Sequence, residues 1–286
     1  MPIAGKSVQF VFQKVERDLL RLSARTQPES VHSFRTTTRR LQTLLEELLP
    51  KRDRNQKNLL KQLDRIRKRA GKVRDLDVQL GALRVLKAAQ EPRRKTQLMQ
   101  ELIEVRAKHE KKLRKALEKE TVRVIRKRLK RAAKHADFEG SREPLAVARE
   151  IMSQAVQRTR PWDEAALHEC RILIKRARYA AEFSARSAES AQLIAQLKRL
   201  QDAIGNWHDW QALTHSATGR LGDVNQSSLV AALRNVTGGK LRSAIAALSA
   251  VQAVPIEQKQ IPAAPERSAK PRTPSRTEEQ LTNSAA

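Results

Sequence analysis

Apolar residues recur along most of this chain at the spacing of amphipathic helices. Between residues 31 and 48, successive turns of about 100° per residue gather the apolar side chains on one side of a helix. These side chains are Phe34, Leu41, Leu44, Leu45 and Leu48. No segment alternates in the manner of a strand, and strong helix formers such as Ala, Leu, Arg, Lys, Glu and Gln dominate. The pattern therefore predicts an all-α chain.

Proline and glycine divide the pattern into separate helices. The expected ranges are 6–26, 29–49, 54–70, 74–90, 93–136, 144–159, 162–187, 190–204, 208–219 and 226–250. Prolines fall between them at Pro28, Pro50, Pro92, Pro144 and Pro161. Glycines mark further expected helix ends at Gly71, Gly140, Gly205 and Gly238-Gly239. The 93–136 segment is left open as one helix or two, because Glu120-Thr121 is a weak break.

A short pattern occurs twice, 136 residues apart. The copies read His32-Ser-Phe-Arg35-Thr-Thr-Thr-Arg39-Arg40 and His168-Glu-Cys-Arg171-Ile-Leu-Ile-Lys175-Arg176. A glutamate follows each histidine after fourteen residues, at Glu46 and Glu182. A second match, at an offset of 134, pairs Gly71 with Gly205, Arg74 with His208 and Asp75 with Asp209. A repeat at a nearly constant offset predicts two halves made by duplication of a helical bundle.

The motif residues form a polar stripe opposite the apolar side. Relative to His32, Arg35 lies at about 300°, Arg39 at about 340° and Glu46 at about 320°. The second copy repeats the stripe with His168, Arg171, Lys175, Arg178 and Glu182. An ordinary solvated helix face mixes Glu with Lys or Arg at i,i+4 spacing, whereas these stripes are almost entirely cationic before the glutamate. Because guanidinium groups suit phosphate oxygens, each stripe predicts one side of an anion cradle.

Further residues are expected to complete this cradle. Arg40 and Arg176 are the last cations of the two motifs, and the histidines add donors that become cationic beside phosphate. The next helix of each half extends the cradle with Arg69, Lys72 and Arg74, and with Lys198, Arg199 and His208. Glu46, Glu182, Asp75 and Asp209 are expected to orient the cations without touching the anion.

The net charge points to a polyanionic partner. The 286 residues include 58 Lys and Arg against 31 Asp and Glu, a net charge of +27. The segment 252–286, rich in Pro, Ala, Ser and Thr, carries only +1 and is expected to be a disordered tail. The field therefore belongs to residues 1–251 and suits nucleic acid, anionic lipid or inorganic polyphosphate. A single cysteine, no signal peptide and no apolar run of ~20 residues predict a cytoplasmic protein without a membrane segment.

Several stretches resemble the CHAD family, named for conserved histidines in an α-helical domain. They are Val31–Leu41, Val73–Val78, Leu167–Phe183 and Leu197–Gly205. The resemblance implies that residues 1–251 form one CHAD domain of two four-helix bundles related by a pseudo-twofold axis, with halves near 1–140 and 141–251. It also implies a basic groove or pore that binds inorganic polyphosphate and brings the protein to polyphosphate granules. Departures at Gln42, Ala70 and His208 make the two halves unequal.

The resemblance further implies a non-catalytic binder without cofactor or metal, which could meet granule-associated proteins. The triphosphate-tunnel module that some members carry is not expected. Two alternatives stay open. General nucleic-acid binding fits the charge, but only 3% of the residues are aromatic and no recognition motif is present. A metal-dependent phosphohydrolase would use His208-Asp209 with His215 and Asp223, although no Gly-rich phosphate loop, zinc spacing or Ser/His/Asp constellation supports an enzyme.

Overall fold

The computed structural model describes residues 5–87, 91–136, 138–157 and 162–252. No strand occurs within these ranges, which confirms the all-α prediction. The described residues belong to one compact unit, Met1–Ala253. The predicted tail, 252–286, lies outside the described residues except for its first residue, Gln252.

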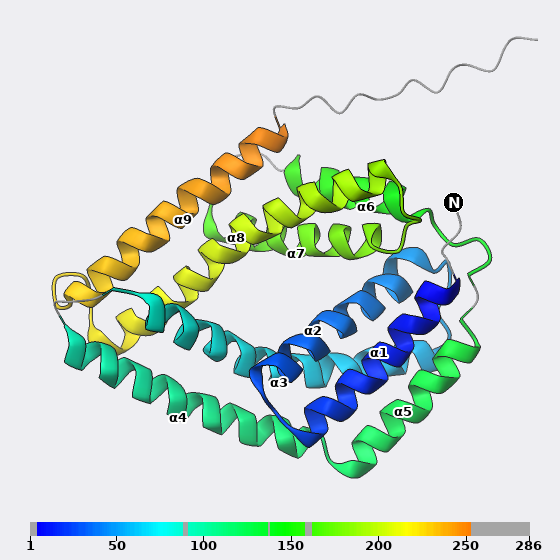
Figure 1. Cartoon of the computed structure of the whole chain (residues 1–286), viewed down its shortest axis with the longest axis horizontal. Coiled ribbons are helices and arrows are strands. Elements are labelled where there is room, and N and C mark those ends of the chain that lie inside the picture. The colour runs from blue at the N-terminus through cyan, green and yellow to red at the C-terminus, as the bar shows by residue number, and fades with distance from the viewer. Residues whose placement is uncertain (1–4, 88–90, 137, 158–161, 253–286) are drawn as a thin grey trace, which may run out of the picture. The chain divides into compact units, whose positions relative to one another are not determined.

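Nine α-helices and one π-helical turn make up the described part of the chain (Figure 1). In chain order they are α1 (Gly5–Ala24), α2 (Pro28–Thr43), η1 (Leu44–Leu48), α3 (Arg54–Val85), α4 (Pro92–Ala116), α5 (Lys119–Lys134), α6 (Pro144–Val156), α7 (Glu164–Ala181), α8 (Ala188–Leu221) and α9 (Ser228–Gln252).

Two four-helix bundles contain most of the hydrophobic core. The first is built from α1, α2, α5 and the beginning of α3, and the second from α6, α7, the beginning of α8 and the end of α9. This arrangement confirms the predicted pair of bundles. The motif helix α2 contacts its counterpart α7, and α3 contacts its counterpart α8. Such contacts between equivalent elements are typical of a pseudo-twofold relation between halves.

The helices α3 and α8 extend beyond the bundles. Their C-terminal parts meet α4 and the beginning of α9 in a second hydrophobic cluster, which includes Leu83, Leu98, Leu213 and Leu233. The two halves therefore pack together in this cluster as well as along α2 and α7. Because both long helices run from a bundle into the shared cluster, they position the residues at their midpoints between the two halves.

The predicted helix ends at Gly71 and Gly205 are wrong, since α3 and α8 run through both positions. Gly238-Gly239 likewise lies inside α9. A glycine weakens a helix interior by only about 1 kcal/mol relative to Ala, and packing along these long helices outweighs that cost. Positive φ occurs among the described glycines at Gly140 (71°) and at Gly222 (83°), which caps α8.

The segment 93–136, for which the sequence allows one helix or two, forms two helices. α4 ends at Ala116 and α5 begins at Lys119, just before the weak break expected at Glu120-Thr121. Leu117 lies between the helices and is buried in the first bundle. The chain therefore turns where an apolar side chain anchors the loop to the core.

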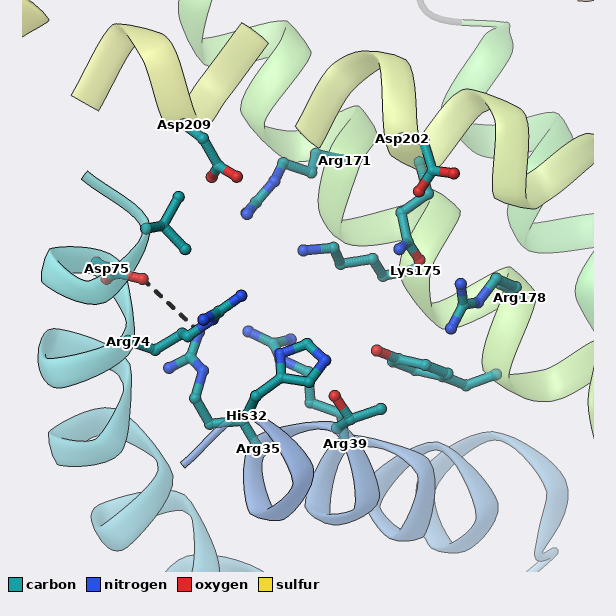
Figure 2. Close-up of a pocket in the computed structure, with 14 residues that line it drawn as sticks. His32, Arg35, Arg39, Arg74, Asp75, Arg171, Lys175, Arg178, Asp202 and Asp209 are labelled. Atoms are coloured by element: carbon teal, nitrogen blue, oxygen red, sulfur yellow. Dashed lines mark ion pairs between the residues drawn. The ribbon is translucent and has the colours of Figure 1, made fainter. Parts of the chain in front are cut away.

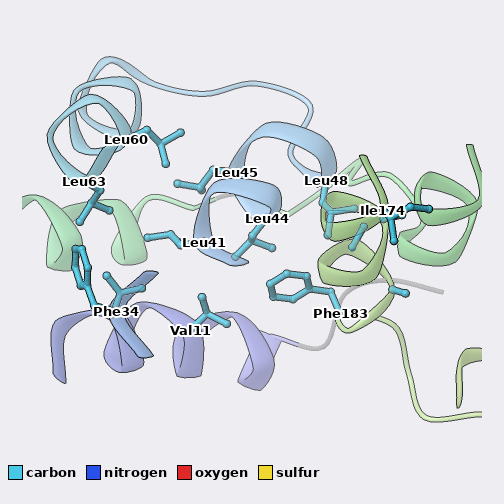
Figure 3. Packing of buried hydrophobic residues seen from close by; sticks show 14 of the residues in the cluster. Val11, Phe34, Leu41, Leu44, Leu45, Leu48, Leu60, Leu63, Ile174 and Phe183 are labelled. Carbon is cyan, nitrogen blue, oxygen red and sulfur yellow. The ribbon is translucent and has the colours of Figure 1, made fainter. Parts of the chain in front are cut away.

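The core that joins the halves lies around η1, which continues α2. Leu44 and Leu48 of η1 face Phe183 and Ile174 of the second half (Figure 3). A π-helical turn has more residues per turn than an α-helix, so each residue advances by less than 100°. This slower rotation turns Glu47 toward the side of the helix that carries the motif.

Candidate anion-binding site

The motif helices α2 and α7 face each other across a cavity of about 360 Å³, with α3 and α8 along its sides (Figure 2). Side chains from both halves point into it. The basic lining residues are His32, Arg35, Arg39, Arg74, Arg171, Lys175 and Arg178. The other lining residues are Thr36, Asp75, Val78, Tyr179, Gln201, Asp202 and Asp209. The structure thus brings both copies of the repeated motif to one site.

A buried carboxylate on α1 sets the rotation of α2. Asp18 is 1% exposed and accepts hydrogen bonds from the hydroxyl groups of Ser33 (2.8 Å) and Thr37 (2.6 Å). Both hydroxyls belong to the motif helix and point into the first bundle. Because side chains four residues apart share one face of a helix, these bonds hold the motif cations on the opposite side, toward the cavity.

Arg35 reaches across the cavity to α3. Its Nη1 donates to the backbone oxygen of Arg67 at 3.3 Å, and its Nη2 lies 3.9 Å from Asp75 Oδ1. This approach depends on Gly71, because a Cβ atom there would overlap the Arg35 guanidinium. The equivalent Gly205 has open space at the same position. Gly71 therefore gives Arg35 room inside a continuous helix.

A second cavity, of about 400 Å³, adjoins the first and shares Arg39, Lys175 and Tyr179 with it. Its remaining lining residues are Gln42, Thr43, Glu46, Glu47, Arg67, Ile172 and Arg176. The ring centroid of Tyr179 lies 5.8 Å from the Arg40 guanidinium carbon and 5.3 Å from that of Arg178, within reach of cation–π attraction. We refer to the two as the central cavities.

Two predicted anion contacts, Arg40 and Arg176, instead pair with carboxylates of the opposite half. Arg40 Nε donates to Glu182 Oε2 at 2.7 Å, and Arg178 Nε lies 3.3 Å from Glu182 Oε1. Arg176 Nε donates to Glu47 Oε1 at 3.1 Å. Arg40 lines neither central cavity, whereas Arg176 lines the second. These ion pairs connect the two halves beside the cavities.

The cations of the central cavities crowd one another. Burial, followed by the charges of Arg171 and Arg39, lowers the pKa of Lys175 to about 7. Burial, followed by the charges of Arg67 and Arg35, lowers the pKa of Arg39 to about 10. Burial also lowers the pKa values of Arg35 and Arg171, although nearby carboxylates act in the opposite direction. An anion between these groups would relieve the repulsion, so the electrostatics favour an anionic ligand.

The histidines lie at the margin of the site. His32 lines the first cavity, and burial followed by the charge of Arg74 lowers its pKa. The rings of His168 and His208 lie 5.3 Å apart between centroids, and neither residue lines a central cavity. Burial, followed by the charge of Arg171, lowers the pKa of His208 to about 4. His208 is therefore neutral near pH 7 in the unbound protein.

The predicted orienting carboxylates occupy different places. Asp75 and Asp209 line the first cavity, and burial raises the pKa of Asp209 against the opposite influence of nearby cations. Glu46 lines the second cavity, accepts a hydrogen bond from Gln42 at 2.9 Å and pairs with Arg52 at 3.2 Å. It therefore contacts the first half only, unlike Glu182.

Besides Arg40, His168 and His208, four more predicted site residues line neither central cavity. Arg69 and Lys72 project from another side of α3 and line a separate groove. Lys198 and Arg199 are exposed on α8 and line neither central cavity. The rotation of the unbroken α3 turns Arg69 and Lys72 away from the cradle, whereas Lys198 and Arg199 precede the residues of α8 that line it.

Sequence reasoning missed Arg67 and Glu47. Arg67 precedes Arg74 by seven residues, so both lie on one side of α3 once the helix continues through Gly71. The false helix end at Gly71 concealed that relation. Glu47 reaches Arg176 through the π-helical turn, for which the sequence carries no comparable signal.

Within the described part of the chain, no group of three or more His, Cys, Asp or Glu side chains is placed to share a metal ion. None of the helices in these ranges combines the length and the apolarity that crossing a bilayer demands.

Comparison with known proteins identifies a family and a fold. A family model described as the CHAD domain matches residues 9–218. The structure is similar to the crystal structure of the CHAD domain from the plant Ricinus communis, with a TM-score of 0.63 and 20% sequence identity. That match covers 86% of this chain and 88% of the plant chain. No match was found among the curated proteins.

Proposed function

Because the chain belongs to the CHAD-domain family, which is linked to polyphosphate binding in general, we propose that it binds inorganic polyphosphate in the central cavities. The binding is non-catalytic and directs the protein to polyphosphate granules in the cytoplasm. The observation that carries the proposal is the convergence of Arg35 and Arg39 from one half with Arg171 and Lys175 from the other on one cavity.

The chemistry of the lining suits a chain of phosphates. Polyphosphate carries roughly one charge per phosphate and presents no bases, so a protein that binds it needs cations along a passage and few other groups. A guanidinium has five N–H donors. Arg35 uses one of them for the Arg67 backbone oxygen and places another near Asp75, which orients the group and leaves donors for phosphate oxygens.

Nucleic acid is the main competing ligand, and a competition experiment separates it from polyphosphate. Labelled long-chain polyphosphate is bound to the full chain and challenged with duplex DNA or RNA at equal phosphate concentration. We expect nucleic acid to displace little of it, because the cavities are narrow and present cations from two sides. Displacement by nucleic acid as effective as that by unlabelled polyphosphate would overturn the proposal.

Absence of catalysis and granule targeting need separate tests. Incubation of polyphosphate with the protein, with and without divalent metal, should release no phosphate above the blank. A fluorescent fusion should gather at polyphosphate granules when cells accumulate the polymer and should stay diffuse when cells cannot make it. Chelator-sensitive phosphate release would instead support the phosphohydrolase alternative.

A further inference from the structure

A second basic surface lies on the outer side of the first half. It is a groove of about 820 Å³ between α3 and the junction of α4 and α5. The cations that line it are Arg65, Lys68, Arg69, Lys72, Lys112 and Lys115. Glu118 is the single carboxylate among its lining residues. We refer to this surface as the outer groove.

The outer groove and the central cavities lie on opposite sides of α3. Relative to Arg67, which lines a central cavity, a rotation of about 100° per residue places Arg69 at about 200° and Lys72 at about 140°. A side chain on one of these faces cannot turn to the other without unwinding the helix. One phosphate group therefore cannot contact both sites, and each needs its own part of a ligand.

The cations of the outer groove differ from the other cations near them in having few carboxylate partners. Close to the groove, Arg106 pairs with Asp77 and Glu110, and Arg114 also pairs with Glu110. Among the described residues, one ion pair involves a cation of the outer groove: Lys68 Nζ lies 3.0 Å from Asp64 Oδ2. An ordinary solvated helix face alternates opposite charges at i,i+4 spacing, so this surface departs from that pattern.

A histidine lies within the positive electrostatic potential of the outer groove. His109 is one of its lining residues. Burial, followed by the positive charges of Lys72 and Lys112, lowers the pKa of His109. The lysines of α3 and α4 thus act on the same point from two sides, as required for groups that could hold one anion together.

The second half repeats only one of the four cations that α3 contributes to the outer groove, since Arg65 corresponds to Arg199. At the offset of 134 that relates α3 to α8, Arg69 corresponds to Ala203 and Lys72 corresponds to Asn206. Lys68 corresponds to Asp202, which lines the first central cavity. The duplicated positions form the central cavities, whereas three of the four α3 cations of the outer groove have no basic equivalent on α8.

No Phe, Tyr or Trp is among the described residues that line the outer groove, so the surface lacks the large aromatic side chains on which bases usually stack. Its chemistry matches that of a phosphate chain without bases. We propose that the outer groove is a second polyphosphate-binding site, which holds a further stretch of a long chain whose other stretch occupies the central cavities. This inference rests on the proposed function. Occupation of two linked sites raises the effective concentration at the second site, so affinity should increase with chain length.

The test compares two triple variants of the full chain. Lys72→Gln, Lys112→Gln and Lys115→Gln remove three charges from the outer groove. The matched control carries Lys57→Gln, Lys130→Gln and Lys134→Gln, which remove three charges from exposed positions of the same half that line neither the groove nor the central cavities. Each protein is titrated with tripolyphosphate, with long-chain polyphosphate and with duplex DNA.

The groove variant should bind long-chain polyphosphate about tenfold more weakly than wild type, while its tripolyphosphate affinity changes by less than about twofold. The control should lose less than about twofold for either ligand, because screened charges far from the ligand contribute little. Equal losses in both variants would overturn the proposal, as would a groove variant that loses duplex DNA but keeps long-chain polyphosphate. If wild type binds neither phosphate ligand, the proposed function itself fails, which is a distinct result.

Discussion

The two halves of the molecule share a motif but differ in net charge. Residues 1–140 hold 38 Lys and Arg against 17 Asp and Glu, a net charge of +21, whereas residues 141–251 hold 15 against 10, a net charge of +5. The main cavity cations are nevertheless divided evenly, since Arg35 and Arg39 come from the first half and Arg171 and Lys175 from the second. The duplicated positions build the central cavities, and most of the excess charge of the first half lies elsewhere.

The two motif helices are also held in different ways. On α2, Ser33 and Thr37 donate to the buried Asp18 of α1. At the matching positions α7 has Glu169 and Leu173, so equivalent hydroxyl groups that could donate to a buried carboxylate are not present there. The cavity-facing side of the motif therefore repeats, whereas the positions of Ser33 and Thr37 carry different residues in the second copy, an exposed glutamate and a leucine.

The largest effect is expected from removing either pair of cavity cations. Arg35→Ala with Arg39→Ala, or Arg171→Ala with Lys175→Ala, should weaken polyphosphate binding by about 100-fold. Each pair contributes two charge-assisted hydrogen bonds worth about 1.5 kcal/mol apiece. Titration calorimetry measures the loss, and circular dichroism should show unchanged helicity. A large loss in one pair variant only would break the even division between the halves.

The hydrogen bonds from Ser33 and Thr37 to Asp18 in the first half predict the next largest effect. Asp18→Ala should lower the free energy of unfolding by about 2 kcal/mol, because the half-buried Ser33 and the buried Thr37 lose their shared acceptor. Urea denaturation measures this change. Adding Ser33→Ala and Thr37→Val should restore part of the stability, because these changes remove the hydroxyl groups that have lost Asp18 as an acceptor. An Asp18→Ala protein as stable as wild type would show that these hydrogen bonds are not needed to hold α2.

The third effect is a pH dependence that the second half contributes through Lys175. The pKa of Lys175 is lowered to about 7, whereas that of its counterpart Arg39 is lowered only to about 10. Between pH 7 and about 10.4 the unfolded chain holds the Lys175 proton and the folded chain does not, so stability contributed by this group rises with pH in that window. A bound polyanion favours the charged lysine, so binding takes up a proton there.

Polyphosphate affinity should therefore fall several-fold between about pH 6 and about pH 8.5 as free Lys175 loses its charge. The control is Lys175→Arg, which keeps its charge in this range and should flatten the decline. Since both proteins meet the same ligand, any titration of the phosphates cancels in the comparison. Equal pH dependence in wild type and Lys175→Arg would contradict the assignment.

The smallest effect concerns the two equivalent glycines. Gly71→Ala should weaken polyphosphate binding about threefold, since the new methyl group displaces the Arg35 guanidinium and weakens about one hydrogen bond. Gly205→Ala meets open space and should leave affinity unchanged while raising the free energy of unfolding by up to about 1 kcal/mol. Matched titrations and urea melts check both outcomes. The same binding loss in both variants would argue against a spacing role for Gly71.

The sequence predicts the motif helices, because apolar periodicity is a local pattern, and it predicts two related bundles, because the motif recurs 136 residues further along. It does not predict which sides of α3 and α8 face the site, since that depends on the helices continuing through Gly71 and Gly205. For this reason Arg67 was missed, and Arg69 and Lys72 were expected in the cradle. Glu47 depends on a π-helical turn that packing between the halves produces, and such packing is not visible in a single segment.

The central claim is that both halves hold one phosphate chain between them. A crystal structure of the full chain with tripolyphosphate tests it most directly. The account predicts phosphate density between α2 and α7, with oxygens in hydrogen-bond range of Arg35 and Arg39 on one side and of Arg171 and Lys175 on the other. Phosphate bound only at exposed surfaces, with none in the central cavities, would contradict it.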